Sequence, residues 1–272
     1  MKLDVCLEAV FTDQPVEKRI ERISKAGYRF VEFWFHDSTM NSPGSKLPQA
    51  KDPAAIRDAC RRCGVKVNNL VVNGPDGGVG GAPVNAKDLA RYLDRLEETI
   101  AFARSIGCRK GITCAGNEQP GLTRARMRAN LTRALARASA VAERHGFTLL
   151  LEPLNTHVDH AGYYLASSLE GADIVREIGS PHLKLLYDVY HMQIMEGNLI
   201  ATIEKNIDVI GHFHSAGVPG RGELFSGELH YPAVIQRLKA KGYGECFGLE
   251  YFPKMSDHAA SLRRTREYLL GR

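Results

Sequence analysis

The chain has 272 residues, of which 44% are hydrophobic and 25% are charged, a composition typical of soluble globular proteins and unlike that of disordered chains. Its net charge of +5 is small and spread along the sequence, so neither a nucleic acid nor an acidic membrane is demanded as a partner. No apolar run approaches the roughly 18 residues of a membrane span, and Asp4 and Glu8 interrupt the apolar stretch that a signal peptide would need. We therefore expect a soluble, cytoplasmic protein.

One theme recurs along the chain: a short apolar run rich in β-branched residues is followed by a loop and then by an amphipathic helix. The helical segments carry apolar residues at intervals of three and four, as at Val16, Ile20 and Ile23. Glycines such as Gly64 and Gly107 follow several of these segments, where a left-handed cap ends a helix. The predicted strands are Leu3–Glu8, Tyr28–Trp34, Val65–Val72, Arg109–Ala115, Phe147–Glu152, Leu183–Asp188, Val209–His214 and Cys246–Tyr251.

Eight strands that alternate with helices predict a parallel sheet covered by helices, and an open doubly wound sheet would show the same alternation. Dividing the 272 residues among eight units gives 34 residues for each, which is the size of one right-handed strand–helix crossover. We therefore predict an α/β fold in the form of a closed (β/α)8 TIM barrel. No linker or low-complexity tract divides the chain, so we expect a single domain over residues 1–272.

Two features of the first half have simpler explanations than a ligand site. Cys60 and Cys63 form a C-x-x-C pair, but no second pair at ligand spacing completes a zinc site. We expect them on the last turn of a helix that ends at Gly64. The glycine-rich stretch Asn73–Val84 lacks the G-K-[ST] ending of a phosphate loop, so we expect a flexible loop there that can serve as a lid over the barrel mouth.

Each of the last four predicted strands ends in a residue that can bind a metal, namely Glu152, Asp188, His214 and Glu250. Active-site groups of a TIM barrel lie at the carboxyl ends of its strands, so these four side chains are expected at one rim. Three carboxylates that converge in a cleft repel one another and lose solvation unless a cation neutralises them. One nitrogen and three oxygen donors suit Mg²⁺ or Mn²⁺, and also Co²⁺, better than a structural zinc. The sequence thus predicts a divalent metal site.

The segments around these positions are distinctive. They read LEPLN at Leu151–Asn155, YDVYHMQIMEG at Tyr187–Gly197, IGHFHSAGVPGRGEL at Ile210–Leu224 and LEY at Leu249–Tyr251. In them the sequence resembles the hydroxypyruvate isomerase family, which belongs to the xylose-isomerase-like TIM barrels. The resemblance implies that the four strand-end residues hold the metal and that Glu152 and Glu250 act as an acid/base pair on opposite faces of the substrate. It also implies that His191 and Arg221 touch substrate oxygens.

The residues themselves are consistent with isomerisation of an α-hydroxy carbonyl compound. A proton leaves the carbon beside the carbonyl, and a divalent cation can stabilise the resulting ene-diolate. Glu152 and Glu250 are then the natural acid and base, with Asp188 and His214 completing the metal shell. Arg221 can bind a substrate carboxylate. This favours hydroxypyruvate over a neutral sugar, and the reaction would interconvert hydroxypyruvate and tartronate semialdehyde.

Two departures from the better-known isomerases leave the substrate open: His214, and the following SAGV, where those enzymes tend to carry an Ala-Asp-Asn run. At His214 the better-known isomerases tend to carry Gln, whereas the related ketose 3-epimerases of the tagatose and psicose type carry His. Those epimerases also carry a substrate-binding Glu near the position where Val158 stands. A ketose 3-epimerase or another sugar isomerase is therefore the nearest alternative. A nuclease of the endonuclease IV type, which needs a histidine-rich zinc cluster, and a non-enzymatic sugar or keto-acid binding module are more distant ones.

The expected partner is a small keto acid or ketose. Association of copies of the chain is a further expectation, for which apolar residues near Trp34–Phe35 or Tyr163–Tyr164 would supply the surface.

Overall fold

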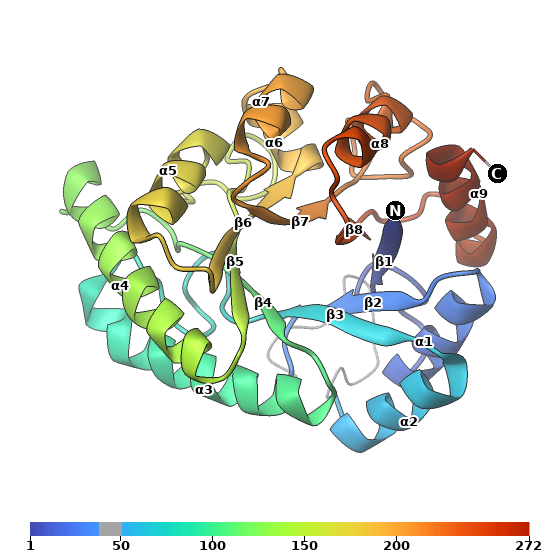
Figure 1. Ribbon diagram of the computed structural model, residues 1–272, viewed down its shortest axis with the longest axis horizontal. Helices are drawn as coiled ribbons and strands as arrows, with labels where there is room; N and C mark the ends of the chain where they lie inside the picture. Colours follow the sequence, from blue (N-terminus) through green and yellow to red (C-terminus); the bar gives the residue numbers. More distant parts are fainter. Residues whose placement is uncertain (38–50, 272) are drawn as a thin grey trace.

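The strands of the protein form one closed parallel barrel with helices around it, as Figure 1 shows for a computed structural model that describes residues 1–37 and 51–271. They follow one another around the ring in the order of the sequence, and β1 closes it by pairing with both β2 and β8. The predicted (β/α)8 TIM barrel is confirmed, and each predicted strand overlaps an observed one. The strands are β1 Lys2–Cys6, β2 Phe30–Phe33, β3 Lys66–Val71, β4 Lys110–Thr113, β5 Thr148–Leu151, β6 Leu183–Asp188, β7 Ile210–His214 and β8 Cys246–Leu249.

The helices begin and end at the signals that the sequence carries. In α2 (Pro53–Cys63) the Asp52 side chain caps the first turn, and Gly64 ends the helix in the left-handed conformation at φ 63°. Cys60 and Cys63 lie on its last turn, as predicted. None of the helices in the described part of the chain is both long and apolar enough to cross a membrane. The others are α1 Val16–Lys25, η1 Ala86–Asp88, α3 Leu89–Ser105, α4 Arg124–Arg144, α5 Ser168–Ile178, α6 Val189–Met195, α7 Leu199–Asn206, α8 Tyr231–Ala240 and α9 His258–Leu270.

The inside of the barrel has an apolar and a polar side. Alternate residues of a strand point to opposite faces, so every second strand residue faces the barrel interior. On one side these residues form a small apolar cluster of Phe35, Val71, Ile112, Leu150 and Leu186. The polar side is supplied by β1, β2, β3 and β7. Its buried members are Asp4, Glu32, Asn69 and His212. Buried polar groups require hydrogen-bond partners. These four side chains lie beneath the carboxyl end of the barrel.

Three of the four residues suggested as an association surface are not exposed, while Trp34 is partly exposed. No more than 2% of the surface of each of Phe35, Tyr163 and Tyr164 is exposed. These residues therefore offer no apolar face to a second copy of the chain. The hydroxyl of Tyr163 donates to the backbone oxygen of Glu152 at 2.8 Å, which turns this ring into part of the barrel rim. Aromatic residues with such inward hydrogen bonds cannot be told from surface aromatics by sequence alone.

The glycine-rich loop at residues 73–84 is tied down by Asn73. Its side-chain amide donates to the backbone oxygens of Gly81 at 3.1 Å and Cys114 at 2.9 Å, and its oxygen accepts from the backbone nitrogen of Cys114 at 3.0 Å. These bonds hold the loop against the end of β4. The role of a lid stays a prediction, although Pro75 of this loop lines the cavity described below.

Candidate active site

A cavity of about 300 Å³ lies at the carboxyl ends of the strands. Glu152, which follows β5, and Glu250, which follows β8, form part of its wall, while Asp188 and His214 are buried beside it as the last residues of β6 and β7. The volume suits a small molecule rather than a macromolecule. The remaining wall is formed by Trp34, Phe35, Val71, Pro75, Cys114, Leu154, Asp159, His160, His191, Arg221 and Phe252.

Three of the four predicted metal ligands come together. Glu152, Asp188 and His214 each offer one ligand atom, and the three atoms lie within 4.8 Å of one another. Nδ1 of His214 lies 3.3 Å from Oε1 of Glu152. This Nδ1 is buried and makes no hydrogen bond within the described part of the chain. A buried imidazole nitrogen that faces two carboxylates without a hydrogen bond is the arrangement that a bound divalent cation would satisfy. The residues therefore fit the predicted metal.

Glu250 is held differently from the other three. Its Oε1 accepts a hydrogen bond from the indole nitrogen of Trp34 at 2.8 Å, and its Oε2 accepts one from Nη2 of Arg221 at 2.6 Å. The same Oε2 lies 3.6 Å from Nδ1 of His214, so Glu250 borders the three-residue group without belonging to it. A carboxylate fixed by two donors and facing a cavity is well placed to exchange a proton with a ligand there.

The charges of the site are unbalanced without a cation. Burial raises the pKa of Glu152 above its ordinary value, although His214 opposes the shift, and burial raises the pKa of Asp188 to about 7. Burial alone would also raise the pKa of Glu250, but in the metal-free site the positive charges of Arg221 and of protonated His214 outweigh it and hold that pKa below its ordinary value. Ionising all three carboxyls here is costly, so a divalent cation would stabilise the site.

His191 presents a hydrogen-bond donor to the site. The backbone N–H of Asn155 donates to its Nδ1 at 3.2 Å, so Nδ1 is an acceptor and the ring proton belongs on Nε2. This Nε2 lies 3.5 Å from Oδ2 of Asp188 and has no hydrogen-bond partner among the described residues. Burial, assisted by the charge of Arg221, keeps the pKa of His191 well below its ordinary value. The ring is therefore neutral and can donate to a substrate oxygen.

Arg221 sits on a constrained turn. Its backbone takes the left-handed conformation at φ 53°, which is rare for a residue with a side chain and is typical of functional positions. The guanidinium lies over the rings of Tyr190 and Phe252, 5.2 and 5.6 Å from their centroids, and its Nε–H makes no hydrogen bond within the described residues. A buried N–H without an acceptor at the cavity wall can be satisfied by an oxygen of a ligand.

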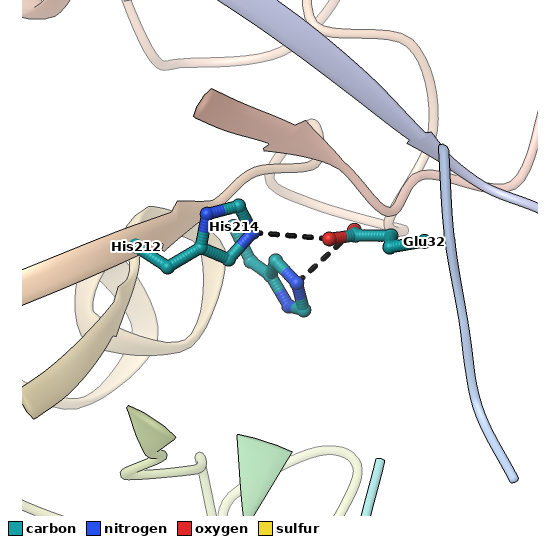
Figure 2. Close-up of side chains that lie close together, drawn as sticks. All are labelled: Glu32, His212 and His214. Carbon is teal, nitrogen blue, oxygen red and sulfur yellow. Dashed lines mark hydrogen bonds and ion pairs between the residues drawn. The ribbon is translucent and has the colours of Figure 1, made fainter. Parts of the chain in front are cut away.

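Three residues at the site were not predicted as functional. Trp34 and His160 line the cavity, and Glu32 lies inside the barrel against His214 (Figure 2). The alternation of strand residues would have placed Glu32 and Trp34 on the same inward face of the second predicted strand. A charged residue on an inward face needs a buried partner, and this was the signal available in the sequence. His160 follows no strand and gave no such signal.

Comparison with known proteins places the chain in a family. The model of the family described as xylose isomerase-like TIM barrel matches residues 20–268. The chain belongs to the xylose isomerase-like TIM barrel family.

Within this family the named relatives of similar sequence are isomerases. A human relative, which is only provisionally named hydroxypyruvate isomerase, is 34% identical over 233 residues, covering 81% of this chain and 82% of its own. The hydroxypyruvate isomerase of Escherichia coli is 27% identical over 261 residues, covering 95% and 96%. The 2-oxo-tetronate isomerase of Cupriavidus necator is 36% identical over 170 residues, covering 62% and 65%. The chain is thus an isomerase, and a non-enzymatic binding module does not describe it.

Solved structures share this fold. A family 2 AP endonuclease from Brucella melitensis superposes with a TM-score of 0.86 at 26% identity and covers 98% of this chain and 99% of its own. An L-ribulose 3-epimerase gives 0.79 at 23% identity and covers 99% and 93%. One barrel therefore carries proteins with very different names, and the substrate has to be argued from the site.

Proposed function

We propose that this family member is a divalent-metal-dependent isomerase that interconverts hydroxypyruvate and tartronate semialdehyde through an ene-diolate, and that residues 1–272 form one xylose-isomerase-like domain. The observation that carries the proposal is the convergence of Glu152, Asp188 and the unsatisfied Nδ1 of His214 beside the cavity. A small-molecule cavity next to a cation-binding group of this kind is what aldose–ketose chemistry requires.

The residues can divide the proton transfers between them. Glu250, which Arg221 keeps ionised, takes the proton from the hydroxyl-bearing carbon, and Glu152, protonated on the carboxyl oxygen that does not bind the metal, delivers a proton to the neighbouring carbon. The hydroxyl proton of the substrate passes to the former carbonyl oxygen, and a proton that moves from Glu250 to Glu152 through solvent resets both carboxyls. Glu152, Asp188 and His214 would hold Mg²⁺, Mn²⁺ or Co²⁺, which would supply stabilisation of the negative charge on the oxygens bonded to these two carbons. His191 Nε2–H donates to one of these oxygens and so helps to orient the substrate.

An acid substrate is favoured by Arg221. Hydroxypyruvate and 2-oxo-tetronate, named in the relatives, are both keto acids with a hydroxyl group on the carbon beside the carbonyl. The Arg221 Nε–H at the cavity wall supplies a cationic donor for their carboxylate. A ketose 3-epimerase remains the second candidate because His214 is present. Against it, Val158 is 69% exposed and does not line the cavity as far as the described residues show.

The test is a rate comparison on two kinds of substrate. With Mn²⁺, the protein is expected to convert hydroxypyruvate faster than D-tagatose or D-fructose. Replacing Arg221 with lysine is expected to lower kcat/KM for hydroxypyruvate by about 10–150-fold, the value of one or two charged hydrogen bonds worth about 1.5–3 kcal/mol. Because Arg221 also binds Glu250, neutral ketoses will lose some rate as well, but less. Faster turnover of a ketose by the unaltered protein, or equal losses on both substrates, would contradict the acid assignment.

A further inference from the structure

The inside of the barrel directly beneath the proposed metal holds a carboxylate flanked by two imidazoles. Figure 2 shows Glu32 of β2 reaching across the barrel toward His212 and His214 of β7. All three side chains are at least 98% buried. Burying a carboxylate costs free energy unless its oxygens accept hydrogen bonds. The partners of Glu32 therefore indicate its role.

The two oxygens of Glu32 have different surroundings. Oε2 accepts a hydrogen bond from Nδ2 of Asn69 at 2.7 Å and lies at hydrogen-bond distance, 3.0 Å, from Nε2 of His212. Oε1 lies 3.1 Å from Nε2 of His214, but the angle at the ring does not complete a hydrogen bond, and both atoms lack one within the described residues. Oε1 is therefore the carboxylate atom that lies within hydrogen-bond distance of Nε2 of His214.

We propose that Glu32 is the positioning residue of the metal site, an inference that rests on the proposed function. Nε2 of His214 carries the ring proton and donates it in a hydrogen bond to Oε1 of Glu32, which leaves Nδ1 unprotonated and directed at Glu152 and Asp188. Histidines that bind metals usually donate their other ring nitrogen to a carboxylate in this way, which fixes the tautomer and the ring plane and strengthens the donor atom.

The packing around His214 supports this assignment. A Cβ atom added at Gly248 would lie 2.8 Å from Cδ2 of His214 and 3.0 Å from Oε1 of Glu32, so the glycine leaves the space in which the two groups meet. The rings of His212 and His214 meet edge to face, with centroids 5.1 Å apart and an interplanar angle of 82°. These contacts confine the ring of His214 between Glu32 on one side and Glu152 and Asp188 on the other.

A second cation between Glu32, His212 and His214 is the competing interpretation, because their ligand atoms also lie within 4.8 Å of one another. It is less favoured because Oε2 of Glu32 is already occupied by Asn69 and His212. His214 would also have to bridge two cations as a fully deprotonated ring, and an ordinary neutral imidazole has only one free lone pair.

Manganese binding tests the proposal without any assay of turnover. Glu32→Gln keeps the shape of the side chain but removes its charge and one acceptor, and we expect it to weaken Mn²⁺ binding by about 10–100-fold. The matched control is Glu223→Gln, another buried carboxylate, which bonds to Lys254, Met255 and Ser261 instead of His214. The control should bind Mn²⁺ within about twofold of the unaltered protein. Calorimetry with MnCl₂ gives both affinity and stoichiometry, and thermal melting of the metal-free proteins separates a loss of folding from a loss of binding.

Three outcomes would overturn the positioning role. These are Mn²⁺ affinity of Glu32→Gln within about twofold of the unaltered protein, an equal loss in Glu223→Gln, and two Mn²⁺ per chain in the unaltered protein.

If Glu32→Gln fails to fold, the unaltered protein answers the question. With Zn²⁺ bound and histidine labelled with ¹⁵N, the ring proton of His214 should be found on Nε2, and a proton on Nδ1 would refute the proposal. Loss of Mn²⁺ binding in Glu32→Gln together with no turnover of hydroxypyruvate by the unaltered protein would sink the proposed function alone.

Discussion

Replacing Glu250 or Glu152 with glutamine is expected to lower kcat for hydroxypyruvate by about 10²–10⁴-fold, the usual contribution of a general acid or base. Glutamine keeps the shape of each side chain but cannot carry a proton between substrate carbons. In Glu250→Gln the amide oxygen can still accept from Trp34 or Arg221, so the loop is expected to stay in place. Steady-state kinetics with saturating Mn²⁺ measures the effect, and circular dichroism checks that the barrel is intact.

The two variants should differ in metal binding. Glu152 belongs to the three-residue group, so Glu152→Gln is expected to weaken Mn²⁺ binding as well as catalysis, whereas Glu250→Gln should affect mainly catalysis. Glu196→Gln is a suitable control, because this half-buried carboxylate bonds to Ser167 and Ser168. Rates near normal in both Glu152→Gln and Glu250→Gln would remove the acid/base assignment.

Removing divalent metal is expected to abolish turnover. After dialysis against EDTA the rate on hydroxypyruvate should fall by at least about 100-fold, because a Lewis acid supplies several kcal/mol of charge stabilisation that no other group here replaces. Addition of Mn²⁺ should restore it, and Mg²⁺ and Co²⁺ should do so to different extents. The barrel does not depend on the metal for its core, so the far-ultraviolet circular dichroism should not change. An undiminished rate in the presence of the chelator would contradict the mechanism.

The fold could be predicted from the sequence because its signals are local. Alternation of apolar strands with amphipathic helices fixes the number of units, and helix caps such as Asp52 and Gly64 lie within the segments that they end. The ends of four successive strands then point to one rim by geometry alone, which is why Glu152, Asp188 and His214 were found as a group. The roles of these residues remain proposals.

The remaining parts of the site depend on contacts between distant strands. Trp34 bonds to Glu250 across β1, and Glu32 meets His214 across the inside of the barrel, so neither partner can be identified before the barrel is closed. The same reason explains why Tyr163 was predicted to be exposed. It lies in a loop of the sequence, but its hydroxyl donates to the backbone oxygen of Glu152 and its ring is buried. The left-handed backbone of Arg221 is likewise set by the turn around it.

The most direct test of the account is a crystal of the protein grown with MnCl₂, with diffraction recorded at the manganese absorption edge. The account predicts one anomalous peak beside the cavity, about 2.0–2.4 Å from a carboxylate oxygen of Glu152, a carboxylate oxygen of Asp188 and Nδ1 of His214, the distances usual for oxygen and nitrogen ligands of such cations. Glu250 should border the ion without binding it directly. No peak at this position, or a peak held by other residues while these side chains point apart, would contradict the central claim.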